Sequence, residues 1–588
     1  VRMPILNSTL IIIVTFIPLF FLTGMEGRML VPLGIAFIVA LFASTVVALT
    51  LTPVLCSYLL GKGKTDKDIS REPFVARTLK KYYGQALEWA LRHRTGVLGG
   101  TIALFVAAMI TFFTLGRSFL PPFNEGSFTI NVSTLPGISL EESDNIGRRA
   151  EELLLEVPEI QTVARKTGRA ELDEHALGVN TSEIEAPFVL GDRSHAEVVA
   201  DVRKKLSVIP GVNIEIGQPI SHRIDAMLSG TQARIAIKLF GDDLNRMFML
   251  GNQIKKNISA IDGVVDLNVE QQIERPQLKI TPRREMLARY GVSLSEFAEF
   301  IDVALAGEVV SQVYEGSRTF DLTVKVKDDE RSSAAKIGDL MVDTQDGKVP
   351  LSYLAEIKSA TGPNTINREN VKRKIVISAN VSDRDLRSVV DDIRERIKET
   401  VVLPEGYFIE YGGQFESEAA ASRTLSFVSL FSLLVVFLLL YNQFRSVSQS
   451  AVILLNLPLA LIGGVFILRF TTGEISIPAI IGFISLFGIA TRNGMLLVSH
   501  YNTMLSEGNS LHDTILRGSL DRLNPILMTA LTSALALIPL ALGGDLPGNE
   551  IQSPMAKVIL GGLITSTFLN AFVVPVVYWI MNRKKENR

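Results

Sequence analysis

PAIIGFISLFGIATRNGMLLVSHY, residues 478–501, is apolar for long enough to cross a lipid bilayer, yet Arg492 and Asn493 interrupt it near its middle. About 20 apolar residues span the hydrocarbon core of a membrane. An arginine at that depth costs roughly 3 kcal/mol and cannot lose its proton to avoid the cost. We therefore expect a membrane helix whose arginine faces the interior of a helix bundle and pairs with a carboxylate. Arg492 is either a structural residue bonded to backbone carbonyls or half of a charge relay for transport, and we favour the relay.

The composition places this helix in a chain of alternating membrane and water-exposed segments. Of 588 residues, 47% are hydrophobic and 20% are charged, and the mean hydropathy is +0.29. The chain is too apolar for an average soluble protein and too charged for one buried wholly in lipid. Its net charge of −2 gives no signature of nucleic-acid binding. The one cysteine, Cys56, excludes a disulfide framework and a thiolate metal cage.

Eight apolar stretches are candidates for membrane helices. They are residues 6–22, 31–60, 97–115, 425–441, 451–468, 478–501, 526–542 and 558–581. The basic segment 61–95 and the basic C-terminal tail are expected in the cytoplasm by the positive-inside rule, which puts 117–422 on the opposite side. Part of the basic segment, residues 80–94, is either an amphipathic helix on the membrane surface or an ordinary basic linker.

An internal repeat links the two ends of the chain. The segment RMPILNS beginning at Arg2 matches RLNPILMT beginning at Arg522 when Pro4 is set on Pro525. Both copies begin at the cytoplasmic side, so the repeats are parallel, a common plan in transporters. We expect residues 1–60 to supply the last two membrane helices of a first repeat. The rest of that repeat, with an acidic partner for Arg492, is expected upstream.

The segment 117–422 repeats a helix, a tight turn and a strand. The expected helices are 140–156, 195–208, 244–260 and 386–400, and the expected strands include 128–133, 214–217, 233–239 and 408–411. Helices joined to strands in this way predict ferredoxin-like βαβ units in one α+β domain. A membrane helix at 96–116 precedes this domain, and five membrane helices with a short tail follow it at 423–588.

Five motifs along the chain then point to a family. They are FLPPFNEG at 119–126, LPGI at 135–138, GPNTINREN at 362–370, GGQFE at 412–416 and ATRNG at 490–494. Together they resemble the resistance-nodulation-cell division (RND) exporters over essentially the whole chain. The resemblance implies the RND transporter fold: a polytopic α-helical membrane protein with a large α+β periplasmic domain, of which this chain supplies spans five to twelve of twelve.

The resemblance also implies partners and an energy source. Expected are a homotrimer in the bilayer of a bacterial inner membrane, a periplasmic adaptor protein and an outer-membrane channel. No nucleic-acid partner is expected. Because no Walker loop, Gly-rich dinucleotide turn or nucleophile–base motif is present, we expect no enzyme activity, no bound cofactor and no use of ATP. The resemblance implies a proton gradient as the energy source.

The resemblance assigns a proton relay to four residues. In drug-exporting relatives, a lysine at the position of Arg492 pairs with aspartates on the fourth span, and an arginine and a threonine match Arg522 and Thr529. Asn493 lies beside Arg492 in the same motif. Arg492 keeps the charge but cannot carry a proton, so the absent acid must titrate. Alternatively, Arg522 is a cytoplasmic anchor and Thr529 bonds a helix carbonyl.

Segments 134–139, 166–171 and 218–225 resemble the heavy-metal branch of the family. Copper and silver members hold the cation between three methionines, whereas this chain has Asn131, Thr181 and Ala226 at the matching positions and Met227 only adjacent. Oxygen and imidazole ligands suit zinc, cobalt, nickel or cadmium better than copper(I). The candidate ligands are Glu171, Asp173, Glu174 and His175 on one loop, with Glu183, His222 and Asp225 nearby. The alternative is that this loop is merely acidic and solvated.

We therefore expect a proton-driven exporter of divalent heavy-metal cations, the inner-membrane permease of a tripartite pump. Within the same class, a multidrug exporter would line its pocket with aromatic side chains instead of acids. From a different class, a membrane sensor or assembly scaffold would have no need of a buried charge such as Arg492.

Overall fold

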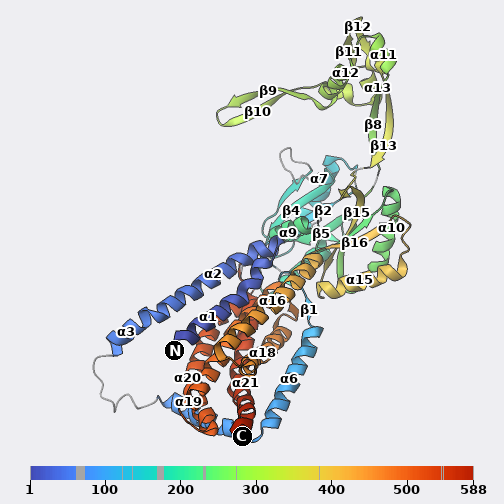
Figure 1. Ribbon diagram of the computed structural model, residues 1–588. Coiled ribbons are helices and arrows are strands. Elements are labelled where there is room, and N and C mark those ends of the chain that lie inside the picture. Colours follow the sequence, from blue (N-terminus) through green and yellow to red (C-terminus); the bar gives the residue numbers. More distant parts are fainter. Residues whose placement is uncertain are drawn as a thin grey trace.

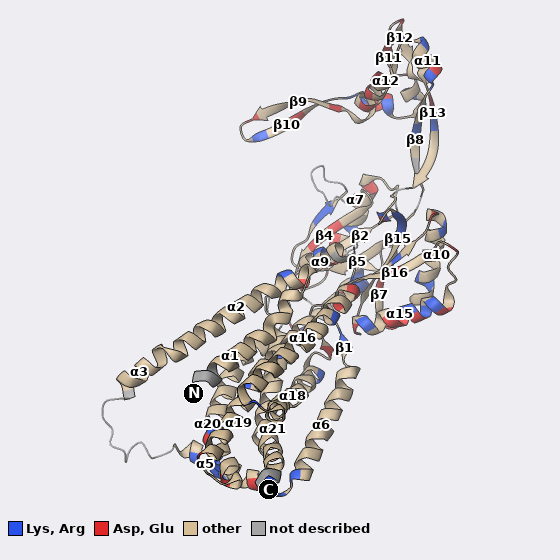
Figure 2. Cartoon of the chain, in the orientation of Figure 1, with Lys and Arg blue, Asp and Glu red and all other residues tan. Residues whose placement is uncertain are grey.

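The computed structural model describes residues 2–60, 73–121, 123–135, 137–168, 178–229, 233–272, 274–363, 365–382, 384–544, 546 and 548–586. Its chain forms a bundle of long helices, a sheet-containing domain at one end of that bundle, and a narrow extension projecting from the sheet domain (Figure 1). Charged residues gather in the sheet domain and at the opposite end of the bundle, whereas most of the helix surface between them is uncharged (Figure 2).

All eight apolar stretches are helical. The helices are α1 (Arg2–Phe16) with the short η1 (Ile17–Phe21), α2 (Gly24–Leu49), α3 (Leu51–Leu60), α6 (Arg94–Thr114), α16 (Gln414–Phe444), α17 (Val447–Leu454), α18 (Asn456–Thr471), α19 (Ile477–Ser506), α20 (Leu511–Leu542) and α21 (Gln552–Glu586). In the described ranges, seven helices are long and apolar enough to cross a membrane, with a shorter apolar helix at Leu6–Phe21. Several helices run beyond their apolar stretches because capped polar turns extend them: α20 begins at Leu511, after the N-cap Ser510, instead of at 526.

The outer surface of the bundle is apolar. Phe42, Phe113, Phe427 and Phe568 are each more than 60% exposed. Exposed aromatic and aliphatic side chains on this scale are typical of a surface that faces lipid. The chain is therefore a multi-pass membrane protein.

The basic segment contains an amphipathic helix. Residues 61–72 lie outside the described ranges, and α5 (Phe74–Arg92) follows. Its buried side is held against the bundle by Leu87 and by Tyr83, whose hydroxyl donates to the carbonyl of Ala571 at 2.7 Å. Helix α5 therefore rests on α20 and α21, with its polar side turned away from the bundle.

The first unit of the sheet domain has the ferredoxin-like order. It runs β2 (Ser127–Ser133), α7 (Leu140–Leu155), β3 (Ala164–Thr167), β4 (Thr181–Pro187), α8 (His195–Leu206) and β5 (Asn213–Gly217). The antiparallel sheet has the order β3-β4-β2-β5. Alternate residues of β2, among them Phe128 and Ile130, form its core with Leu154 of α7 and Val198 of α8. The residues between them face the other side of the sheet.

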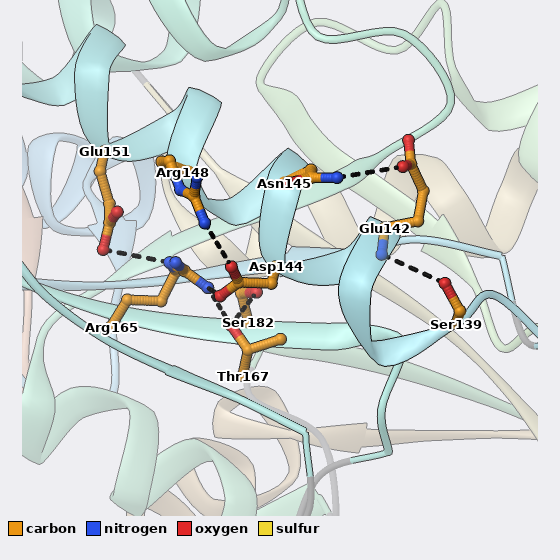
Figure 3. Close-up of polar contacts among 9 residues, drawn as sticks. All are labelled: Ser139, Glu142, Asp144, Asn145, Arg148, Glu151, Arg165, Thr167 and Ser182. Atoms are coloured by element: carbon orange, nitrogen blue, oxygen red, sulfur yellow. Dashed lines mark hydrogen bonds and ion pairs between the residues drawn. The ribbon is translucent and has the colours of Figure 1, made fainter.

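Arg165 fastens the edge strand β3 to helix α7. Its guanidinium contacts Asp144 at 2.9 Å and Glu151 at 3.1 Å, and it also donates to Thr167 (Figure 3). The side chain lies so close over Gly147 that an added Cβ there would be 2.7 Å from Arg165 Cδ. A glycine at 147 is what allows β3 to lie against the helix.

The second unit repeats this plan around an insertion. It runs β6 (Ile235–Phe240), α10 (Leu244–Ile258), β7 (Val264–Val269), β15 (Lys372–Val381), α15 (Leu386–Thr400) and β16 (Phe408–Gly413). Strand β15 pairs with both β6 and β7, and β6 pairs with β16, all antiparallel. The predicted α+β domain of ferredoxin-like units is thus confirmed, with helices and strands close to the expected residues.

The insertion between β7 and β15 forms the extension. Its stem pairs β8 (Glu274–Pro282) with β13 (Ala355–Pro363), and the other elements are α11 (Arg284–Arg289), α12 (Leu294–Ile301), η2 (Asp302–Ala306), η3 (Asp328–Arg331), α13 (Ala334–Gly338), β11 (Met341–Thr344), β12 (Gly347–Pro350) and α14 (Leu351–Leu354). A hairpin of β9 (Glu308–Glu315) and β10 (Arg318–Val324) reaches sideways from it, with every residue exposed (Figure 1). After the stem, the chain returns to the sheet of the second unit, where β14 (Arg368–Glu369) pairs with β15.

The second unit is continuous with the membrane bundle. Strand β16 ends at Gly413, whose φ of +97° favours glycine, and α16 begins at the next residue and runs into the bundle. At this junction the buried Glu418 accepts from Arg387 of α15 at 2.8 Å and from Ser422 at 2.7 Å. The second unit is therefore joined directly to a membrane helix, by the chain itself and by the Arg387–Glu418 pair.

Candidate functional site

The four residues of the predicted proton relay lie around one cavity inside the membrane bundle. Helices α1, α2, α19 and α20 enclose a space of about 260 Å³ whose lining includes Arg492, Asn493, Arg522 and Thr529. Its other polar lining comes from small hydroxyl side chains, including Thr45 of α2, so the space is polar although it lies among apolar helices.

Within this cavity, Arg492 forms no ion pair with any residue in the described ranges. Asn493 beside it is 4% exposed. The Thr529 hydroxyl donates to the carbonyl of Pro525 at 2.8 Å, so this side chain does bond a helix carbonyl. A partly buried guanidinium without a counter-charge is costly among apolar helices, and a carboxylate next to Arg492 would stabilise it.

A titratable pair that we did not predict lies along the same two helices. His500 Nε2 of α19 is 3.5 Å from a carboxylate oxygen of Asp521, the residue before Arg522 in α20. Two turns separate His500 from Arg492. The signal in the sequence was weak, because a histidine and an aspartate at helix ends usually face solvent.

The second site is a cavity of about 550 Å³ in the sheet domain, with lining residues from both ferredoxin-like units. Helix α9 (Pro219–Ser229) joins the units, packing against β2 of the first and β16 of the second. Two predicted metal ligands, His222 and Asp225, are on this helix and line the cavity. The structure therefore brings these two residues together.

His222 has the burial and the protonation state that suit a metal ligand. It is 4% exposed, and neither ring nitrogen has a hydrogen-bond partner among the described residues. Burial lowers the pKa of His222 to about 4, against the opposing influence of Glu183 and Asp266. The ring is consequently neutral near pH 7, which is the form that binds a metal ion.

Asp225 provides a carboxylate beside it. The side chain is 3% exposed, and the Gln414 amide donates to its Oδ1 at 2.8 Å. Burial raises the pKa of Asp225 to about 6, with the positive charge of Arg234 and the Gln414 hydrogen bond acting against the rise. At pH 7 this buried group is ionised, and a bound cation would stabilise its charge.

The remaining predicted ligands are placed differently. Glu183 does not line the cavity; it lies in register with Asn131 on the sheet face that points away from the core, and its carboxylate pairs with Lys166 at 2.5 Å. Glu171, Asp173, Glu174 and His175 lie outside the described residues. In the described ranges no three His, Cys, Asp or Glu side chains are grouped closely enough to hold a metal ion. Of the three predicted ligands that the structure describes, His222 and Asp225 thus line the cavity, whereas Glu183 pairs with a lysine on the adjacent strand.

Three further polar residues at this interface were missed. Glu215 lies in register with Asn131 on β5, and its carboxylate accepts from Ser378 of the second unit at 3.2 Å. Arg203 of α8 and Asp266 of β7 line the cavity. Only Glu215 left a signal, since it alternates with Ile214 and Ile216 on a half-buried strand.

The residues at and beside the positions that match the copper ligands also bear on the choice of metal. Asn131 is buried on β2, whereas Met227 is 64% exposed and does not line the cavity. The cavity therefore offers imidazole and carboxylate groups and no thioether, a donor set that favours zinc, cobalt, nickel or cadmium over copper(I).

Comparison with known proteins adds independent findings. Residues 1–582 match the AcrB/AcrD/AcrF family. The cobalt-zinc-cadmium resistance protein CzcA of Cupriavidus metallidurans is 33% identical, over 100% of this chain and 56% of CzcA. The nickel and cobalt resistance protein CnrA of the same organism is 31% identical over 99% of this chain and 55% of CnrA. The cation efflux system protein CusA of Escherichia coli is 28% identical over 98% of this chain and 56% of CusA.

A solved structure matches the fold. The crystal structure of a heavy metal efflux pump superposes with a TM-score of 0.84 at 28% identity, covering 99% of this chain and 59% of that one. The chain thus spans little more than half the length of the relatives that it matches.

Proposed function

The chain belongs to the AcrB/AcrD/AcrF family, and from that premise we propose that it is part of a proton-driven inner-membrane permease that exports divalent heavy-metal cations. The observation that carries the proposal is the membrane cavity, where Arg492, Asn493, Arg522 and Thr529 from α19 and α20 meet. A sensor or scaffold needs no such charged cavity, whereas a proton-coupled transporter does.

The metal substrate is supported by the second cavity. Neither ring nitrogen of its buried His222 has a hydrogen-bond partner in the described part of the chain, and Asp225 supplies a carboxylate on the same helix. An organic-compound exporter would present a pocket lined mainly by aromatic side chains. Among the described lining residues, two are Phe, Tyr or Trp (Phe123 and Phe128), while seven are Asp, Glu, Arg or His. The charged lining favours a cation.

In the proposed topology, segment 61–95 and the C-terminal tail lie in the cytoplasm, and 117–422 lies in the periplasm. Residues 1–60 are the last two membrane helices of a first repeat, 96–116 is one span, and 423–588 supplies five more. The exposed β9–β10 hairpin, with apolar side chains such as Val310 and Phe320, is suited to contact a neighbouring copy in a homotrimer. The far end of the extension would meet the periplasmic adaptor and the outer-membrane channel.

The proposed mechanism couples the two cavities. A carboxylate outside the present chain pairs with Arg492; when it is protonated, Arg492 changes partner and the helices around the membrane cavity shift. Because α16 continues from β16 into the bundle and Arg387 ties α15 to it, the shift moves the second ferredoxin-like unit against the first. The cavity between the units then opens and closes around the metal ion.

Metal resistance in living cells tests the substrate assignment. The full-length transporter is expressed in a strain lacking its own metal exporters, and growth is scored against zinc, cobalt, nickel, cadmium and a panel of dyes and antibiotics. The wild type is expected to protect against one or more of the metals, and His222→Ala to abolish that protection. Met227→Ala, on the exposed side of the same helix, is the matched control and should protect fully.

Protection against organic compounds and not against metals would favour a multidrug exporter. Full protection by His222→Ala would show that the cavity of the sheet domain is not the metal route.

A further inference from the structure

An ion pair joins the two ferredoxin-like units across the cavity of the sheet domain. Arg203 of α8 in the first unit donates from Nε to Asp266 Oδ1 at 2.8 Å and from Nη2 to Oδ2 at 3.0 Å, with Asp266 on β7 of the second unit. The Asp266 side chain is 4% exposed. Both residues line the same cavity as His222 and Asp225. The bidentate pair is therefore part of the proposed metal chamber and also a bond that holds the chamber closed.

The backbone places the Asp266 carboxylate in this position. Asp266 has a φ of +50°, a left-handed conformation that few residues other than glycine adopt. On the facing strand, the pairing with β7 shifts register between Ser378 and Asn380, and the Asn380 amide donates to Asp266 Oδ2 at 3.1 Å. The irregular backbone of β7 and β15 thus turns the Asp266 carboxylate toward the first unit.

Besides the assigned ligands His222 and Asp225, the cavity contains the Asp266 carboxylate, which also attracts a cation. Asp266 and His222 are close enough to interact electrostatically. A buried carboxylate is neutralised either by the guanidinium or by a metal ion, and holding both cations at once adds like-charge repulsion in a site of low dielectric. Arginine side chains keep their positive charge in proteins, so the competition is decided by which cation lies on the carboxylate.

We infer that Arg203 is a resident competitor for the metal site: a divalent cation bound at His222 displaces Arg203 from Asp266 and parts the two units, and the return of Arg203 expels the cation. This inference rests on the proposed metal-exporting function and deepens it. It assigns the release step to a residue of the chain itself. The exchange makes and breaks only ionic contacts and metal–ligand bonds, since one cation replaces another on the same carboxylate.

Competition predicts that substitutions of Arg203 and of Asp266 change the metal affinity in opposite directions, which a purely structural ion pair does not predict. Removing the competitor with Arg203→Gln should make the site bind metal more tightly, by at least about tenfold, because the metal no longer has to displace a cation from the buried Asp266 carboxylate. Asp266→Asn should bind metal at least about tenfold more weakly. A mere clamp would lose affinity in both variants, because the cavity would lose its shape.

Isothermal titration of the purified full-length transporter in detergent, at pH 7, with Zn²⁺ alone and with Co²⁺ alone, measures these affinities. Arg193→Gln is the matched control: Arg193 pairs with Glu159 and Asp201 beside the same helix but does not line the cavity, so its removal should leave the affinity unchanged. Arg203→Lys keeps the charge and the stem but cannot form the bidentate pair, and its affinity should fall between those of wild type and Arg203→Gln. If Arg203→Gln fails to fold, Arg203→Lys decides the question by the same sign.

The results separate the two claims. Metal binding by the wild type with equal or weaker binding by Arg203→Gln and Arg203→Lys overturns the competitor role and leaves the proposed function standing. Absence of Zn²⁺ and Co²⁺ binding in the wild type and in Arg203→Gln overturns both. Tighter binding by Arg203→Gln together with slower release in a stopped-flow chelator chase supports the inference.

Discussion

Replacing Gly217 by alanine would place a methyl group where the His222 ring now lies. A Cβ built on Gly217 is 2.1 Å from both Cδ2 and Nε2 of the imidazole. Gly217 cannot retreat, because β5 is held in register against Thr129 of β2. The ring cannot turn into solvent either, since His222 is only 4% exposed. The substitution therefore has to displace the imidazole.

The size of the displacement follows from these distances. Ordinary contact between a Cβ and a neighbouring atom begins near 3.4 Å, so the ring must move by about 1.3 Å. Bonds from a metal ion to protein ligands tolerate deviations of only about 0.2 Å. Misplacing even a group that merely supports a ligand costs roughly 10- to 100-fold in metal affinity. Gly217→Ala should thus weaken metal binding at least about tenfold, or ~1.4 kcal/mol.

Titration of purified full-length Gly217→Ala with Zn²⁺ and Co²⁺ at pH 7 measures the loss, and a thermal unfolding curve confirms that the variant is folded. Gly191→Ala, in the same ferredoxin-like unit, is the control, because a Cβ built on Gly191 meets nothing within 4 Å. Both variants should stay folded and unfold near the temperature of the wild type. In Gly217→Ala, overpacking can lower the free energy of unfolding by roughly 1–3 kcal/mol. Wild-type affinity in a folded Gly217→Ala would refute the role given to His222.

Three further predictions concern stability. Burial raises the pKa of Asp225 from 3.8 to about 6, so the contribution of this carboxyl to stability is present below pH 4 and is lost as the pH rises through 6. Without metal, Asp225→Asn should therefore be more stable than the wild type at pH 7, by up to about 3 kcal/mol. Thermal unfolding at pH 4 and at pH 7 measures the difference. Arg387→Ala leaves the buried Glu418 unpaired and should cost about 3–5 kcal/mol in denaturant unfolding, whereas Glu418→Gln should cost less. Gly463→Val brings a Cβ to 2.0 Å from the Gly561 carbonyl oxygen and should lower the melting temperature of the membrane bundle.

Each of these has a result that contradicts it. If Asp225→Asn were stabilised equally at pH 4 and at pH 7, burial of the charge would not be the cause of the gain in stability. Equal losses in Arg387→Ala and Glu418→Gln would mean that the unpaired charge is not the origin of the cost. Gly99→Val is the control for the helix packing, since nothing lies within 4 Å of a Cβ at Gly99; a comparable loss there would point to β-branching in the helix and not to contact between α18 and α21.

Local patterns predicted most of the elements. Helix α15 was expected at 386–400 and occurs at Leu386–Thr400, because its apolar residues recur at helical spacing and Asp385 caps its first turn. The apolar stretches predicted the membrane helices for the same reason. Gly413, a glycine at positive φ, marks the change from strand to helix at the edge of the bundle.

The sites were predictable only in part. The meeting of Arg492 with Arg522 and Thr529 in one cavity was expected from resemblance, and no spacing along the chain shows it. The pairing of Arg203 with Asp266 was missed because it joins residues of two separate units, and neither residue interrupts a local pattern. Cross-strand register likewise decided that Glu183 meets Lys166, which sequence alone did not reveal.

The central claim is that a positive charge at position 492 couples proton movement to metal export, and gradient-driven transport tests it most directly. The full-length transporter, its Arg492→Met variant and its Arg492→Lys variant are reconstituted in proteoliposomes, and Zn²⁺ movement is followed after an imposed pH gradient. We predict that Arg492→Met abolishes the gradient-dependent movement, that Arg492→Lys retains part of it, and that both variants bind Zn²⁺ in detergent as the wild type does. Gradient-driven Zn²⁺ movement by Arg492→Met at the wild-type rate would contradict the account.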